Sequence, residues 1–219
     1  MIDLAWILKH KVFGRSRYYE QPVMDHVKRV RGNMFVDVGA NIGRYAIRLA
    51  RNFKTIHAFE PNPYYFHTLK ENAPRNIVLH PSALSDTDGE CLLYLNIVGH
   101  GGSADTILKE FHYNPADNPK GEQKYVGSEE QSVRVPMNRF DTLFKEDVDL
   151  VKIDVEGAEF LVLAGMERGL SEQTVKRLVV ELHDASQRFR LEELFMRKHY
   201  RTGWLDPTHL YAWAKEVNQ

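Results

Sequence analysis

The chain has 219 residues, with 29 lysines and arginines against 30 aspartates and glutamates, and a formal net charge of −1 at pH 7. This length suits a single α/β domain over residues 1–219, and the charge argues against a large nonspecific surface for nucleic acid. The one cysteine, Cys91, excludes an intrachain disulfide and fits the cytoplasm, and no run of about 18 apolar residues predicts a membrane span.

The first 31 residues are apolar at their start and then basic, and we expect them to form a helical cap on the sheet. Lysines and arginines from Lys9 to Arg31 surround Tyr18 and Tyr19. Such a mixture can bind an RNA backbone or an anionic sugar. The solvated face of capping helices explains it more simply, so both interpretations stay open.

An apolar strand, residues 34–38, runs into a turn of small residues, and a helical pattern follows from Arg44. β-Branched residues such as Val36 suit a covered strand. Gly39 and Gly43 let the backbone turn sharply and approach a ligand closely. A strand, a glycine turn and a helix in this order predict the cofactor-holding corner of a doubly wound α/β domain.

The spacing of this turn separates two kinds of nucleotide cofactor. A dinucleotide pattern needs glycine at its first, third and sixth positions, and counting from Gly39 the chain has Asn41 and Arg44 at the last two. The alternative, acid-x-Gly-x-Gly-x-Gly, fits with Asp37 as the acid and one replacement, Asn41, which tolerates left-handed backbone. That pattern is typical of class I methyltransferases. A nicotinamide-dependent oxidoreductase is therefore disfavoured.

Two further strands are predicted at residues 55–59 and 76–80. Glu60 follows the first of them, roughly 20 positions after the glycine turn, where an acid can accept hydrogen bonds from ribose hydroxyls. Ser82 and Ala83 follow the second, in the loop that borders the adenine in this fold. Small residues in a tight turn would look the same, so the adenine assignment is the weaker of the two.

The segment 97–132 interrupts the rhythm of strands and helices. It follows a hairpin-like strand, residues 90–95, and contains several glycines, prolines and charges. A loop this long in a compact domain is usually a lid, a binding loop or disordered. We expect it to select the acceptor, because the motifs of the core are all assigned to the cofactor.

The fourth predicted strand, residues 149–153, opens into a group of carboxylates. Asp154 should lie at the carboxyl end of the strand, in the crevice where open α/β sheets bind ligands. Glu156 and Glu159 are three positions apart, which fits a shared active-site face and an ordinary acidic helix start equally well. The fifth strand ends at His183, within reach of the same crevice.

These motifs together resemble the FkbM-type methyltransferases, in that family's order and over roughly residues 33–185. The segments that carry the resemblance are Phe35–Gly43, Phe59–Pro61, Ala83–Asp86, Val135–Met137 with Asp141–Leu143, and Val151–Glu159. It implies a Rossmann-like class I methyltransferase fold, with a mostly parallel central sheet, helices on both faces and a β-hairpin or loop insertion. It also implies S-adenosylmethionine as cofactor and S-adenosylhomocysteine as product.

The resemblance also assigns roles to individual residues. The cofactor contacts that it implies are Asp37, Gly39, Asn41, Gly43 and Glu60. We expect further cofactor contacts from Ala40, Pro61, Asn62 and Asp154. Asp154 and Glu156 correspond to the active-site signature. A hydroxyl acceptor reacts better when a base takes its proton, and we expect Asp154 first and His183 second in that role.

The expected reaction is O-methylation of a hydroxyl on a sugar or another polar metabolite. An RNA ribose 2′-O-methyltransferase and a catalytically idle cofactor-binding scaffold remain as alternatives. A hard cation would fit where Asp154, Glu156 and Glu181 converge, but no spacing requires one, and we expect no metal. No pattern in the sequence indicates an oligomeric state.

Overall fold

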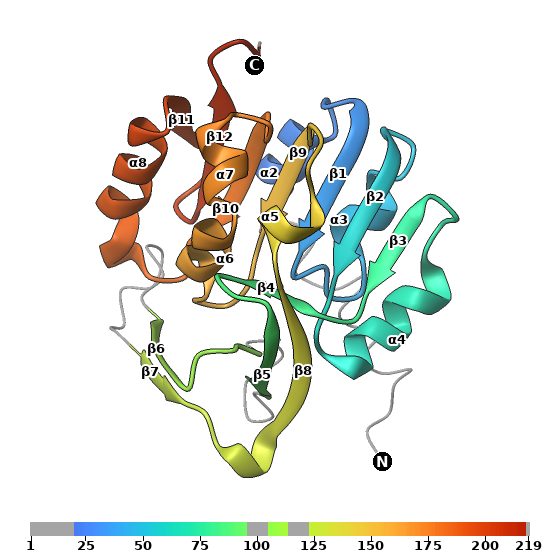
Figure 1. The fold of residues 1–219 in the computed structure, drawn as a ribbon, viewed down its shortest axis with the longest axis vertical. Helices are drawn as coiled ribbons and strands as arrows, with labels where there is room; N and C mark the ends of the chain where they lie inside the picture. The colour runs from blue at the N-terminus through green and yellow to red at the C-terminus, as the bar shows by residue number, and fades with distance from the viewer. Residues whose placement is uncertain (1–19, 96–104, 114–122, 218–219) are drawn as a thin grey trace.

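A computed structural model of the chain describes residues 20–95, 105–113 and 123–217, without the side chains of 111–125. Within these ranges the main sheet has seven strands in the order β11-β12-β10-β9-β1-β2-β3 (Figure 1). Their bounds are β1 Gly32–Val38, β2 Phe53–Phe59, β3 Ile77–His80, β9 Leu150–Ile153, β10 Arg177–Glu181, β11 Tyr200–Trp204 and β12 His209–Ala214. Among these strands β12 alone runs in the direction opposite to the other six, so the predicted mostly parallel α/β fold is confirmed.

Helices cover both faces of this sheet, as the alternation of apolar residues on its strands requires. On β1, Val36 and Val38 pack into one core and Phe35 into the other. The first core takes residues from α5 Phe140–Leu143, α6 Glu159–Gly165, α7 Glu167–Ser171 and α8 Arg188–Arg197. The second takes residues from α2 Gln21–Val27, α3 Arg44–Arg48 and α4 Pro63–Asn72.

The described residues between 83 and 139, which include parts of the insertion and the strands on either side of it, form β-structure below the main sheet in Figure 1. In the described part of the chain, β8 lies between β4 and β5 in a sheet of three strands, and Cys91 of β5 is opposite Val135 of β8. A separate pair, β6 with β7, and the short helix η3 occupy part of the expected lid. The bounds are β4 Ala83–Ser85, β5 Gly89–Tyr94, β6 Glu110–Tyr113, β7 Gln123–Val126, η3 Glu129–Gln131 and β8 Ser132–Arg139.

Helix α6 joins the small sheet to the main one. A Cβ added at Gly165, at the carboxyl end of α6, would lie 2.0 Å from the carbonyl oxygen of Ser85 on β4. The two backbones therefore touch, and only glycine permits this distance. The same helix begins at Glu159, beside the carboxyl end of β9.

The expected amino-terminal cap is described only from residue 20 onward. There α2 packs Val23, Met24 and Val27 into the second core, and the helical cap as a whole stays a prediction. The basic residues before position 20, with Tyr18 and Tyr19, lie outside the described residues. In the part of the chain that is described, no helix has the length and apolarity needed to cross a membrane.

Candidate active site

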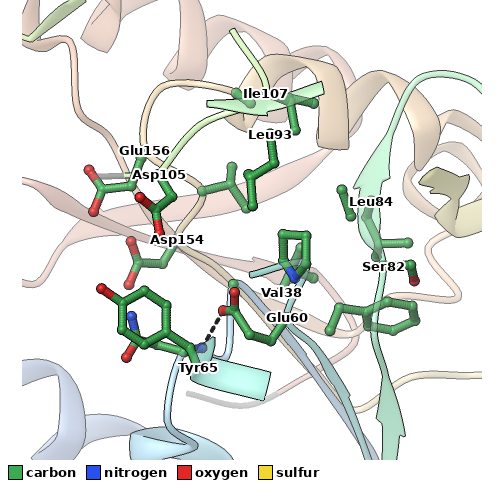
Figure 2. A pocket seen from close by; sticks show the side chains of 17 residues that line it. Val38, Glu60, Tyr65, Ser82, Leu84, Leu93, Asp105, Ile107, Asp154 and Glu156 are labelled. Atoms are coloured by element: carbon green, nitrogen blue, oxygen red, sulfur yellow. Dashed lines mark hydrogen bonds between the residues drawn. The ribbon is translucent and has the colours of Figure 1, made fainter. Parts of the chain in front are cut away.

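The site lies where three neighbouring parallel strands end. Gly39 follows β1, Glu60 follows β2, and Asp154 follows β9, and β1 lies between the other two. The carboxyl ends of parallel strands meet at one edge of a sheet, so residues far apart in sequence come together there. Figure 2 shows the side chains of Glu60, Asp154 and Glu156 along one cleft at this edge.

The glycine turn follows the predicted backbone. Gly39, Asn41 and Gly43 have φ angles of 79°, 52° and 89°, so Asn41 takes the left-handed conformation that its residue type tolerates. A Cβ on Gly39 would lie 1.8 Å from the carbonyl oxygen of Asp154. The turn and the end of β9 are therefore in direct backbone contact, and a side chain at Gly39 would force them apart.

Glu60 is fixed by backbone amides on both sides. Its Oε2 accepts a hydrogen bond from the amide of Asn41 at 2.7 Å, and its Oε1 accepts one from the amide of Asn62 at 2.7 Å. The side chain is 5% exposed. Burial raises the pKa of Glu60 to about 8, although both amides favour the ionised form. The carboxyl group is thus held rigidly at the cleft wall.

The cleft holds about 640 Å³, open solvent included. The sequence-predicted residues that line it are Gly39, Asn41, Glu60, Pro61, Ser82, Ala83, Asp154 and Glu156. Lining residues that sequence reasoning missed are Tyr65 on α4, Leu93 on β5, and Asp105 and Ile107 in the insertion. The side chain of Asn62 caps α4 and donates to Asp105 Oδ2 at 2.6 Å, which joins the insertion to the cofactor corner.

Other predicted residues support the turn from behind instead of lining the cleft among the described residues. Asp37 is 1% exposed and accepts a hydrogen bond from the amide of Ala46 at 3.0 Å, so it fixes α3 against β1. The amide of Ala40 donates to the carbonyl of Phe59 at 2.9 Å. Gly43 is the N-cap of α3. Direct contact of these residues with a cofactor stays a prediction.

Asp154 has a buried cation beside it. The ammonium of Lys152 is 2.8 Å from Asp154 Oδ2, and the Lys152 side chain is only 4% exposed. Burial would raise the pKa of Asp154, but the charges of Lys152 and His183 lower it to about 2. Asp154 is therefore ionised at neutral pH and is a weak base.

His183 lies behind the cleft wall and is bound from two sides. Its Nδ1 is 2.7 Å from Oε1 of Glu159, which is 2% exposed. Its Nε2 is 3.2 Å from Glu156 Oε2 and 3.8 Å from Asp154 Oδ1. Burial would lower the pKa of His183, but Glu156 and Glu159 raise it well above the ordinary value. The sequence left open whether Glu159 was only a helix start; it is the residue that orients His183.

Glu156 is held in place by a tight turn. Its φ of 52° is left-handed, which is uncommon for a residue other than glycine, and Gly157 follows with a φ of 98°. The amide of Gly157 donates to Glu159 Oε1 at 2.8 Å. Burial raises the pKa of Glu156 to about 8, although His183 opposes the shift. Strained backbone of this kind is characteristic of functional sites.

The group of possible metal ligands differs from the one expected. In the described residues, donor atoms of Asp154, Glu156 and His183 all lie within 4.8 Å of one another. Glu181 does not join them: its Oε2 is 3.2 Å from Nε2 of His209, a fully buried histidine on β12 that takes this carboxylate as its partner. The prediction that Glu181 converges with Asp154 and Glu156 was wrong for the described residues. The expected absence of a metal stays a prediction.

Comparison with known proteins gives the family. A family model described as the methyltransferase FkbM domain matches residues 37–202. The chain belongs to the FkbM methyltransferase domain family. The matched region contains the glycine turn, Glu60, the Asp154 turn and His183, so the whole edge described above belongs to the family domain.

Characterised relatives of this FkbM-family chain are distant. The 31-O-demethyl-FK506 methyltransferase FkbM of Streptomyces tacrolimicus is 26% identical over 208 residues, which cover 86% of this chain and 79% of that protein. The hexuronic acid methyltransferase AglP of Haloferax volcanii is 30% identical over 151 residues, 67% of this chain and 54% of AglP. The chain therefore spans only about half the length of AglP.

Solved structures agree on the fold. A methyltransferase FkbM from Methylobacillus flagellatus matches with a TM-score of 0.56 at 18% identity, over 83% of this chain and 44% of that one. A precorrin-6y C5,15-methyltransferase from Geobacter metallireducens matches with a TM-score of 0.51 at 15% identity, over 90% of this chain and 87% of that one. At these identities the likeness establishes a shared methyltransferase fold.

Proposed function

We propose that this FkbM-family chain is an S-adenosylmethionine-dependent O-methyltransferase that acts on a hydroxyl of a sugar or another polar metabolite. The observation that carries the proposal is the juxtaposition of Glu60 and Asp154, at the ends of strands on either side of β1, with the Glu156–His183 pair. The names of two relatives, a 31-O-demethyl-FK506 methyltransferase and a hexuronic acid methyltransferase, support an oxygen acceptor and a sugar, respectively.

The residues of the cleft fit the cofactor. Glu60 offers carboxylate oxygens for ribose hydroxyls, and Ser82 and Ala83 leave room for a flat adenine. Gly39 keeps the turn open, with no Cβ between it and Asp154. When bound there, S-adenosylmethionine supplies an already activated methyl group.

The geometry favours a base other than the first one expected. Asp154 is held ionised by Lys152, which makes it a poor proton acceptor but a good partner for a positively charged donor. Glu156 faces the cleft, and His183 Nε2 lies directly behind it, oriented by Glu159. We therefore assign proton removal to the carboxylate of Glu156, with the protonated imidazole of His183 behind it as its counter-charge, and electrostatic stabilisation to Asp154.

In this mechanism the chain's own residues do three things. The glycine turn and Glu60 fix the donor, so that positioning supplies much of the rate acceleration. The carboxylate of Glu156, which His183 holds from behind, accepts the proton of the acceptor hydroxyl as that oxygen takes up the methyl group. Asp105 and Ile107 cover one side of the cleft and limit the access of water.

The RNA alternative rests on the basic residues between Lys9 and Arg31, and a sugar or polar metabolite is preferred to it because one relative is named a hexuronic acid methyltransferase. A cytoplasmic location is proposed on the single cysteine. The decisive experiment incubates the chain with methyl-labelled S-adenosylmethionine and fractionated cell extract. Label in a carbohydrate or small-molecule fraction supports the proposal, label in RNA favours the alternative, and no transfer together with cofactor binding indicates an idle scaffold.

A further inference from the structure

Lys152 is a buried charge at the centre of the sheet. It is 3% exposed and lies on β9, between β1 and β10. Lysine is almost never fully buried unless it is paired, because removing its ammonium from water is costly. An apolar residue of similar volume would fill the same space without that cost. The charge itself therefore needs an explanation beyond packing.

The surroundings of Lys152 connect two parts of the site. In the sheet register it is directly opposite Asp37 of β1, and its ammonium is 2.8 Å from Asp154 Oδ2. The Tyr45 ring lies under the ammonium, 4.5 Å from Nζ to the ring centroid. The other charged or titratable groups that act on Lys152 or on these partners are Glu20, Arg44, Glu181, His183 and His209.

We propose that Lys152 is a positioning residue that keeps Asp154 ionised and fixed in the cofactor cleft, and that holds it together with Asp37 behind the glycine turn. The inference rests on the proposed function, since it concerns the carboxylate that faces the bound donor. Lys152 is not among the described residues that line the cleft, so it would act on the cleft through Asp154.

The electrostatics agree with this geometry. Burial would lower the pKa of Lys152, but the carboxylates of Asp154 and Asp37 raise it above its usual range. Burial raises the pKa of Asp37 to about 6, and Lys152 limits that rise. Without the ammonium, Asp154 would keep its burial and lose its nearest counter-charge, so it would take up a proton closer to neutral pH.

The test is the pH profile of S-adenosylhomocysteine binding by calorimetry between pH 5.5 and 8.5, using the full chain. In Lys152→Met we expect affinity to fall about tenfold or more relative to the wild type at the acidic end and to approach the wild-type value as pH rises, in addition to the pH dependence that Glu60 gives both proteins. In Lys152→Met/Asp154→Asn the titrating carboxylate is gone, so the profile should regain its wild-type shape. Lys176→Met, on a half-buried lysine that is paired with Asp147 away from the cleft, is the matched control and should leave the pH profile of binding unchanged.

The outcomes separate the two proposals. Wild-type chain that binds no S-adenosylhomocysteine at any pH contradicts the proposed function. Wild-type binding with an unchanged profile in Lys152→Met overturns the role of Lys152 and leaves the function standing. If Lys152→Met fails to fold, thermal melting of Lys152→Met/Asp154→Asn decides. Recovery of thermal stability in the double variant supports the proposal. An equal loss of stability makes Lys152 purely structural and overturns the proposal.

Discussion

The edge of the main sheet and the insertion both contribute walls to the cleft, but they are built differently. At the sheet edge, Glu60 is fixed by two backbone amides and Gly39 touches the backbone of Asp154. The insertion contributes side chains such as Asp105, which reaches Asn62 through a side-chain hydrogen bond. The donor side is thus set by the backbone of the fold. The insertion side is set by individual side chains and can vary without disturbing the sheet.

The largest effect should come from the base, which depends on the sheet edge and not on the insertion. Glu159→Gln and His183→Gln should each reduce methyl transfer by about 10²–10⁴-fold, because general base catalysis is typically worth that much. Binding of S-adenosylhomocysteine should persist, since neither residue lines the cofactor cleft among the described residues. His57→Gln, a half-buried histidine on β2 that contacts His80, is the control. Undiminished transfer in both variants would refute the assignment.

Next in size is Gly39→Ala. A methyl group 1.8 Å from the carbonyl of Asp154, at a φ of 79°, must push the turn and β9 apart. We expect a loss of about 3 kcal/mol or more in the free energy of unfolding and no measurable S-adenosylhomocysteine binding. Gly203→Ala on β11 is the matched control, because its added Cβ has no neighbour closer than 4.0 Å. Thermal melting measures the stability and calorimetry measures the binding. Normal S-adenosylhomocysteine binding in Gly39→Ala would contradict the view that backbone contacts at the sheet edge set this side of the cleft.

Glu60 gives a pH prediction whose sign follows from its raised pKa, about 8. The folded chain keeps this proton where the unfolded chain has lost it. The contribution of Glu60 to the free energy of unfolding is therefore complete below the pKa of the unfolded chain, near 4.5, and is lost as pH rises through about 8. Ribose hydroxyls donate to the ionised carboxylate, so binding below pH 8 should release a proton.

Calorimetry of S-adenosylhomocysteine binding at pH 7, in two buffers with different ionisation enthalpies, measures that proton release. Glu60→Gln should abolish it and weaken binding by about tenfold or more, the loss typical of one charged hydrogen bond. Glu193→Gln on α8, which removes a partly exposed carboxylate paired with Arg197 and far from the cleft lining, serves as the control. Equal proton release in Glu60→Gln and the wild type would show that another group titrates.

The smallest effect should come from the insertion. Asp105→Ala removes the 2.6 Å hydrogen bond with Asn62, and an ordinary side-chain hydrogen bond is worth about 1 kcal/mol net. The affinity for S-adenosylhomocysteine should fall about fivefold, while Asp105→Asn, which keeps an acceptor oxygen, should fall less. A loss in Asp105→Ala as large as in Gly39→Ala would mean that the insertion, too, determines the donor site.

The sequence was sufficient for the fold and for the donor side because those parts follow local rules. Apolar strands ending in small or acidic residues located the three strand ends, and the spacing placed Glu60 and Asp154 at one edge. The left-handed conformation of Asn41 was also predictable, since asparagine is one of few residues that adopt it readily.

What the sequence could not supply was long-range pairing. Glu159 has the pattern of any acidic helix start, and its partner His183 is 24 positions away. Glu181 was misplaced because its partner, His209, lies on an antiparallel strand added later in the chain. Asp105 belongs to an insertion without periodicity, so no pattern indicated that it would reach the cleft.

Helix α6 has a mechanical consequence. Its first residue, Glu159, sets the orientation of His183, and Gly165 rests on the backbone of Ser85 in the small sheet. The helix is only seven residues long, which is too short to bend appreciably between these two points. A displacement of the small sheet would therefore be transmitted along α6 as a rigid rod and would tilt the imidazole. Helix α6 therefore links the small sheet to the imidazole beside Glu156.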